Sequence, residues 1–162
     1  MKLFMRKDIS DVGTRFSVYD ETYCLRYKVT GCKKSLTEIM VVSTRNGVPM
    51  LTIKVAPMHF AHLFSIRDEN ERFYISVWGG PQNPVFRFHG ISWRIDREPI
   101  GRSFQLVDAD SSVVMIQDGV HFITDGYYVL DVKNDSRELF CVATAVCADL
   151  LNFIDATQTA SV

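Results

Sequence analysis

The sequence predicts a mainly β protein, a closed antiparallel β-barrel of about twelve strands that encloses one hydrophobic C-terminal α-helix. Two observations predict this fold. Short alternating or β-branched runs recur between residues 16 and 133, separated by clusters of Asp, Asn and Gly. They are followed by one segment, residues 139–154, whose apolar residues cover every face of a helix instead of a single stripe. Such a helix is expected to be surrounded by protein.

Six predicted hairpins account for the β region, and the last of them turns at Asp125-Gly126, a strong two-residue hairpin signal. The twelve predicted strands are residues 16–18, 24–29, 39–42, 50–55, 62–66, 73–77, 85–88, 92–95, 103–107, 113–116, 121–124 and 127–132. A meander of this length would leave exposed edges, so we expect the sheet to close on itself. Loops are expected at residues 56–58 and 79–84, where Pro and Gly exclude a central strand.

The C-terminal segment begins with residues typical of a helix N-terminus. Asp135 is expected to cap the helix, and Glu138, three residues later, completes a capping box. The apolar run is about ten residues long, shorter than the roughly 20 that cross a bilayer, so burial is favoured and no transmembrane helix is expected. A barrel of this size is too wide for its own side chains to fill, and a buried helix supplies the missing core.

Length and composition indicate one globular domain over residues 1–162. The chain is 47% hydrophobic and 23% charged, with a formal net charge of −1, so it lacks the basic excess typical of nucleic-acid-binding proteins. The charge is uneven, because residues 1–60 hold 10 Lys and Arg against 5 Asp and Glu. Charges interrupt the first apolar residues before a signal peptide could form, so we expect a cytoplasmic location and four reduced cysteines.

Catalytic and metal-binding motifs are missing from the sequence. His59 and His62 have H-x-x-H spacing, but the Glu of an H-E-x-x-H zinc site is lacking. No phosphate-loop, dinucleotide or hydrolase motif occurs, and Ser, His and Asp show no spacing that selects a triad. We therefore expect a non-enzymatic protein with no cofactor and no bound metal.

Several short motifs occur in an order that resembles the LURP-one-related family, and the resemblance covers nearly the whole chain. They are MKLFMRK at 1–7, FSVYD at 16–20, YKVTG at 27–31, ISWRI at 91–95, VMI at 114–116 and YYVLD at 127–131, followed by the apolar helix. The resemblance implies a fold similar to the tubby C-terminal domain, a twelve-stranded barrel around a central hydrophobic helix, and a relation to phospholipid scramblases. In tubby proteins, surface Lys and Arg bind phosphoinositides.

Two hypotheses for function remain open, together with an unrecognised enzyme site that a deep pocket of titratable groups would reveal. The first is a module that binds anionic phospholipid peripherally at a membrane surface, where each basic side chain contributes about 1 kcal/mol. Its candidate residues are Lys28, Lys33, Lys34, Arg45 and Lys54. Against it stands the alternative that these residues are only solvated hairpin charges. The second is a protein-interaction or scaffold domain that contacts a protein partner through loops such as residues 79–84.

Overall fold

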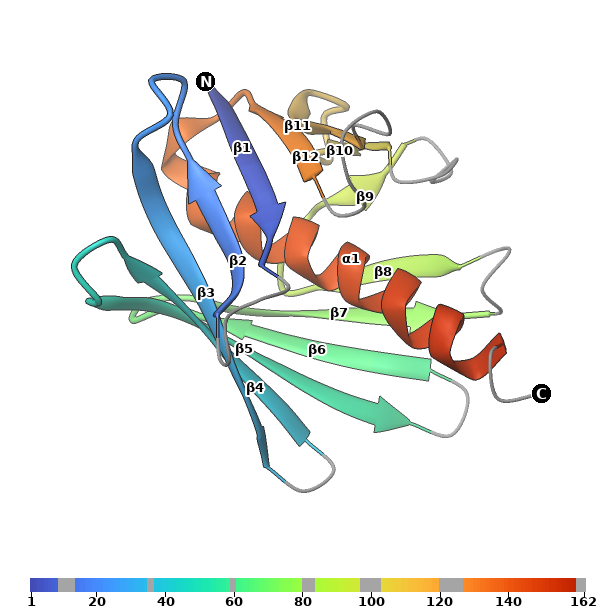
Figure 1. The fold of residues 1–162 in the computed structure, drawn as a ribbon. Coiled ribbons are helices and arrows are strands. Elements are labelled where there is room, and N and C mark those ends of the chain that lie inside the picture. The colour runs from blue at the N-terminus through green and yellow to red at the C-terminus, as the bar shows by residue number, and fades with distance from the viewer. Residues whose placement is uncertain are drawn as a thin grey trace.

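The computed structural model of the 162-residue chain is one antiparallel sheet wrapped around one long helix (Figure 1). It describes residues 1–8, 14–34, 37–58, 61–79, 84–96, 103–119 and 127–159. The strands are β1 (Lys2–Lys7), β2 (Thr14–Tyr19), β3 (Leu25–Lys34), β4 (Thr37–Thr44), β5 (Pro49–Met58), β6 (Ala61–Arg67), β7 (Arg72–Trp78), β8 (Val85–His89), β9 (Arg94–Ile95), β10 (Phe104–Val107), β11 (Val113–Gly119) and β12 (Tyr127–Val132). A 3-10 turn, η1 (Asp135–Arg137), leads into α1 (Glu138–Thr159).

The twelve strands follow the order β8-β7-β6-β5-β4-β3-β2-β1-β12-β11-β10-β9. Every neighbouring pair is antiparallel, and β1 closes the sheet onto β12 through the register Lys2↔Asp131 to Arg6↔Tyr127. Strands β8 and β9 are the two ends of the sheet, and no ladder joins them within the described residues, so the barrel is nearly closed. In Figure 1, α1 crosses the middle of the molecule, with β1 and β12 above it and β5 and β6 below it. The predicted fold class is confirmed.

Two details of the predicted strand list need correction. Residues 2–7 form β1, which the prediction omitted because Lys and Arg interrupt its short apolar pattern; Leu3 and Met5 nevertheless point into the core and are fully buried. Strand β12 pairs with β11 on one side and with β1 on the other, so its hairpin partner is β11. The predicted strand 121–124 and the turn at Asp125-Gly126 lie outside the described residues.

The loop predicted at residues 56–58 is instead the end of β5, which runs to Met58. Pairing with β4 stops at Glu38↔Val55, whereas pairing with β6 continues through Pro57↔His62 to Met58↔Ala61. Beyond Val55 the strand therefore has one paired neighbour, and proline is tolerated because no second ladder requires its missing N–H. Of the second predicted loop, residues 80–83 lie outside the described residues.

The helix α1 supplies the centre of the core, as the sequence predicts. Its fully or nearly fully buried apolar residues are Phe140, Cys141, Val142, Ala143, Ala145, Val146, Cys147, Leu150 and Leu151. They contact the inward residues of the strands in one continuous hydrophobic cluster. Cys141 and Cys147 are free thiols in this cluster, and burial raises the pKa of Cys141 to about 12 and raises that of Cys147 as well. Both residues are therefore uncharged packing groups.

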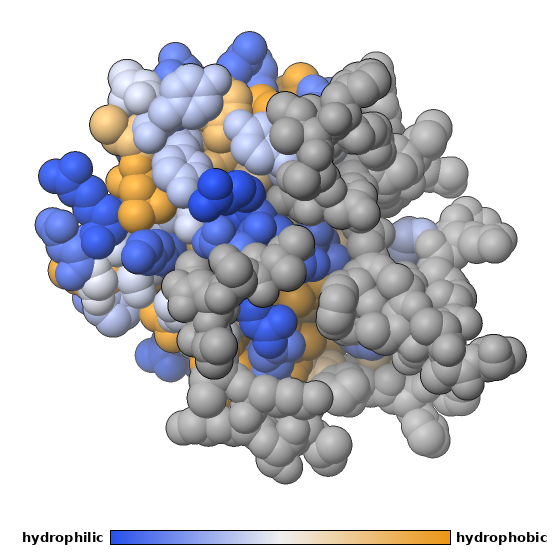
Figure 2. Space-filling view, in the orientation of Figure 1, coloured by the Kyte–Doolittle hydropathy of each residue, from blue (hydrophilic) through white to orange (hydrophobic). Residues whose placement is uncertain are grey.

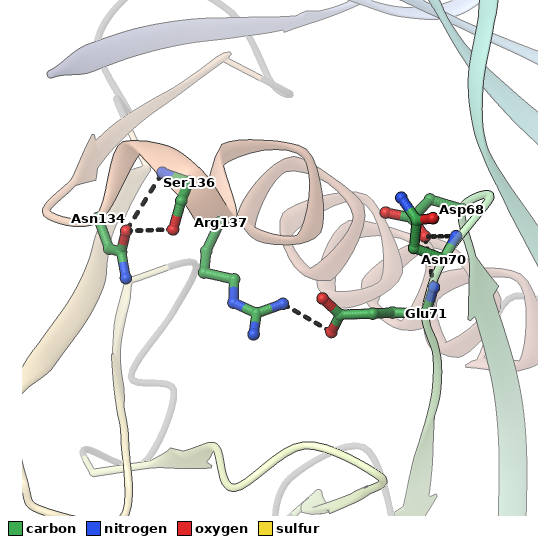
Figure 3. A network of polar contacts seen from close by, with 6 residues as sticks. All are labelled: Asp68, Asn70, Glu71, Asn134, Ser136 and Arg137. Atoms are coloured by element: carbon green, nitrogen blue, oxygen red, sulfur yellow. Dashed lines mark hydrogen bonds and ion pairs between the residues drawn. The ribbon is translucent and has the colours of Figure 1, made fainter.

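The N-terminus of the helical segment is capped by Asn134, not by Asp135. The Asn134 side-chain oxygen accepts hydrogen bonds from the Ser136 backbone N–H at 3.2 Å and from its hydroxyl at 2.7 Å (Figure 3). The cap lies one residue earlier because a 3-10 turn precedes the α-helix. Glu138 does not complete a capping box, because its buried carboxylate binds the guanidinium of Arg26 instead.

Two buried carboxylates attach α1 to the surrounding strands. Glu138 forms a bidentate ion pair with Arg26 of β3, which raises the pKa of Arg26, and the second of the two contacts measures 2.9 Å. Asp149 accepts from the Lys7 Nζ of β1 at 2.9 Å and from the Tyr128 hydroxyl of β12. The two carboxylates are eleven residues apart in the sequence, so they lie on the same face of the helix. They are about 16 Å from each other along the helix axis. The two attachments therefore fix the position of the helix along its axis and its rotation about that axis.

Removing the helix should abolish the folded state. Each large buried side chain on α1 contributes roughly 1.5–3 kcal/mol, and the net stability of a domain is only about 5–15 kcal/mol. We expect a chain lacking residues 138–162 to be insoluble or molten, with loss of near-UV circular dichroism. A truncated protein with a sharp, cooperative thermal transition would show that α1 is peripheral to the fold.

The buried attachment at Asp149 should stabilise the protein more than a surface ion pair of the same kind. We expect Asp149→Asn to lower the free energy of unfolding by about 2 kcal/mol, because the substitution removes a buried carboxylate that accepts from Lys7 and Tyr128. The matched control is Asp131→Asn, which removes the partner of exposed Lys133, 2.7 Å away, and should cost less than about 1 kcal/mol. Urea denaturation measures both; equal losses would contradict the buried attachment.

Candidate functional site

The outer face of β5, β6, β7 and β8 carries charged side chains of one sign. Alternate residues of these strands point into the core, and the residues between them point outward. The four strand sequences contain four basic residues and no Asp or Glu. The four are Lys54, Arg67, Arg72 and Arg87, all of them exposed. We refer to them together as the basic wall.

Strand register brings these four residues together from separate parts of the sequence. Arg67 and Arg72 are direct cross-strand partners. Lys54 lies two residues further along β5 than Thr52, which is the partner of Arg67, so Lys54 is a diagonal neighbour of this pair. Arg87 faces Ser76 on the far side of β7. The strands are about 4.8 Å apart, so the basic wall spans only about 15 Å across the sheet.

The like charges of Arg67 and Arg72 are not neutralised by the acidic turn between them. The Asp68 side chain accepts hydrogen bonds from the backbone N–H groups of Asn70 and Glu71, both at 2.7 Å, and so holds the turn in shape. Glu71 points away to Arg137, with an Nη1–Oε2 distance of 2.7 Å (Figure 3). No basic-wall residue has an ion pair with any described residue. Two directly opposed cations destabilise a sheet, so an anionic ligand would be favourable here.

Three of the four basic-wall residues line a shallow concavity of about 370 Å³ on this face. Lys54, Arg67 and Arg72 supply its positive charge, and the carboxylates Asp68 and Glu69 also line it. The other lining residues are Pro49, Met50, Leu51, Thr52, Ser65, Asp68 and Glu69. Guanidinium groups present several N–H donors in a planar fork that matches carboxylate and phosphate oxygens. The arrangement is thus suited to binding a phosphate or carboxylate group at the surface.

A hydrogen-bonded chain of side chains continues the outer face beyond the basic wall. The Trp78 indole N–H donates to Ser76 Oγ at 3.2 Å, and Ser76 Oγ lies 3.0 Å from His89 Nε2. A Ser–His contact is part of many nucleophilic sites, but in the described part of the chain no carboxylate orients this histidine as a triad requires. The indole N–H also occupies the serine oxygen. We therefore assign the contact a structural role in fixing Trp78.

The structure separates the five basic residues that the sequence analysis selected. Lys54 belongs to the basic wall, and Lys28 is exposed on the same outer sheet face, two strands away and about 13 Å further along. Arg45 is exposed in the turn between β4 and β5. Lys33 and Lys34 end β3 at the other end of β4, paired in register with Glu38 and Thr37. The eight residues of β4 put about 25 Å between Arg45 and these two lysines.

Sequence reasoning missed Arg67, Arg72 and Arg87, although a signal was present. Arg67 and Arg72 flank a turn containing Asp68, Glu69 and Glu71, so the segment as a whole has no basic excess. Only strand pairing shows that the arginines share the outer face of the sheet, while the acids belong to the turn between β6 and β7. The usable signal was the run of consecutive predicted strands in which no carboxylate occurs.

Several basic residues elsewhere on the barrel are paired with acids. Arg6 contacts Asp8 at 3.2 Å, and Arg15 forms an ion pair with Glu38. Figure 2 shows the face over β1, β2 and β3, where hydrophilic, intermediate and hydrophobic side chains are interspersed. These two arginines therefore differ from the cations of the basic wall, which form no ion pair with a described residue.

The described residues contain neither a metal-binding cluster nor a membrane-spanning helix. Across the residues that the structure describes, no group of three His, Cys, Asp or Glu side chains could hold a metal ion. His62 lies on β6 with its Nδ1 buried and unpartnered, while His59 of the H-x-x-H pair lies outside the described residues. Within the same described residues, no helix is long and apolar enough to cross a bilayer.

These features define a class of protein, a twelve-stranded antiparallel barrel built around a buried C-terminal helix. The chain belongs to the LURP-one-related family, whose family model matches residues 1–149. It is similar to the uncharacterized protein YxjI of Bacillus subtilis, with 22% identity over 169 residues that cover 98% of each protein. The X-ray structure of a protein from Arabidopsis thaliana has the same fold, with a TM-score of 0.60, 14% identity, and coverage of 92% of this chain and 91% of that one.

Proposed function

We propose that this protein is a peripheral module that binds anionic phospholipid surfaces, and that the basic wall is its contact face. The observation that carries the proposal is the absence of any carboxylate from four adjacent strands that present four exposed cations. Membrane surfaces rich in anionic lipid attract such clusters, and each Lys or Arg near the surface contributes about 1 kcal/mol. No reaction is assigned to the site.

The direct opposition of Arg67 and Arg72 is the strongest support for an anionic ligand. The pair costs stability in the free protein, and the cost is relieved when a lipid phosphate lies between the two guanidinium groups. Lys54 lines the same concavity and adds a third donor. A headgroup phosphate bound here would contact charge from three neighbouring strands, so the rigid sheet, and not a loop, would determine the geometry.

The basic residues outside the basic wall belong to the same proposal as additional contacts. Lys28 lies on the same outer face, and Lys33, Lys34 and Arg45 lie at the two ends of the neighbouring strands β3 and β4. Their separation means that they cannot all contact one headgroup, although a flat membrane surface could meet several of them. The alternative of a protein partner at loop 79–84 concerns a segment whose residues 80–83 lie outside the described residues.

The double substitution Arg67→Ala with Arg72→Ala should weaken membrane binding without unfolding the protein. Loss of two cations at about 1 kcal/mol each predicts a roughly 30-fold weaker association. Cosedimentation with vesicles of phosphatidylcholine and phosphatidylserine, at low and high salt, measures this association. Binding should fall as salt increases, because the Debye length shortens. The melting temperature should not fall, because a repulsive pair has been removed.

The matched control is Arg6→Ala with Lys133→Ala, which removes the same charge from residues paired with Asp8 and Asp131. This variant should bind vesicles nearly as well as the parent protein. Arg67→Lys with Arg72→Lys tests whether charge alone is sufficient or whether the guanidinium fork is needed. If the parent protein does not cosediment with anionic vesicles at low salt, the proposed function is wrong. Equal loss of binding in both double alanine variants would show that only net charge matters.

A further inference from the structure

Two large apolar side chains are exposed together next to the basic wall. Trp78 is 45% exposed and Val85 is 49% exposed. They are direct cross-strand partners at the end of the β7–β8 pair, on the same outer face as the basic wall. Arg87 lies two residues from Val85 on the same face of β8, about 7 Å away. Two exposed apolar side chains, Trp78 and Val85, thus lie next to the exposed cation of Arg87.

The indole N–H of Trp78 already has a hydrogen-bond partner inside the protein. The indole N–H donates to Ser76 Oγ, which in turn lies within hydrogen-bond distance of His89 Nε2. When His89 Nε2 accepts the serine hydroxyl, its proton lies on Nδ1. Transfer of the exposed part of the ring out of water therefore leaves no unpaired donor, which removes the usual cost of burying an indole. The hydrogen bonds also hold the ring in one orientation.

The second tryptophan shows that the exposure of Trp78 is particular to this position. Trp93 is 5% exposed and packs edge-on against Phe73 and Phe88 in the core. Trp78 forms no such ring contact in the described structure. Two exposed residues are too few for a stable protein interface, which buries about 800 Å² on each partner. Tryptophan is, however, enriched at membrane interfaces, where its ring lies at the level of the headgroups.

We propose that Trp78 and Val85 form an apolar anchor that inserts among the headgroups of an anionic bilayer while the basic wall contacts the lipid phosphates. The inference rests on the proposed function and adds a second, salt-insensitive part to the attachment. The charge complementarity of the adjoining basic wall identifies the occupant as an anionic lipid surface. Burial of the exposed ring area strengthens binding about tenfold.

Intrinsic fluorescence tests the anchor directly. The emission of Trp78 can be distinguished from that of Trp93 because one surface substitution removes Trp78. Parent protein and the Trp78→Phe variant are titrated with phosphatidylcholine–phosphatidylserine vesicles, with and without brominated phosphatidylcholine. The difference between the two emission spectra belongs to Trp78. We expect this difference spectrum to shift to the blue on binding and to be quenched by the brominated lipid. Trp78→Ala should bind about tenfold more weakly, with a loss that persists at high salt.

Val85→Ala and Val48→Ala provide a matched pair, because Val48 is also largely exposed, at 55%, but lies in the β4–β5 turn. Only Val85→Ala should weaken binding. Cosedimentation of the parent protein with no blue shift and no quenching of Trp78 overturns the anchor and leaves the proposed function intact. Failure of the parent protein to cosediment at all overturns the proposed function and the anchor with it.

Discussion

The interior of a twelve-stranded barrel has to be filled, and α1 is the part of the chain that fills it. From Phe140 to Leu151 every residue of the helix except Ala148 is buried, because the strands wrap around it. The inward residues of the strands are consequently apolar and are committed to contact with this one helix. Glu138 and Asp149, the two buried carboxylates among the described residues, each find a cation on a surrounding strand.

A filled barrel leaves only its outer surface for binding. In each strand, residues of one parity are committed to the core, so those of the other parity are free to carry charge. Strands β5, β6, β7 and β8 use these positions for basic, uncharged polar and some apolar residues and for no acid at all. Because the positions lie on hydrogen-bonded strands, the guanidinium groups are spaced by the register of the sheet. The same register places Trp78 beside Val85 at the end of that face.

Local patterns in the sequence determined which parts of this structure could be predicted. The alternating runs were sufficient to predict the barrel, and the helix that is apolar on every face was sufficient to predict what fills it. Both patterns span many residues. Single-residue details were not predictable: Asn134 caps in place of Asp135 because a 3-10 turn intervenes, and Pro57 continues a strand because one neighbour has ended. The basic wall was not predicted, for a related reason. Arg67 and Arg72 become neighbours only through pairing, which composition does not reveal.

The pairing of β1 with β12 has a consequence for how the molecule is made. Lys2 lies opposite Asp131, so one edge of β1 can pair only with a strand that is synthesised almost 130 residues later. The other edge of β1 pairs with β2. The helix that fills the centre follows even that partner along the chain. Ribosome-bound intermediates therefore hold a sheet with an empty, apolar concave side, and folding is completed only after nearly all of the chain has emerged.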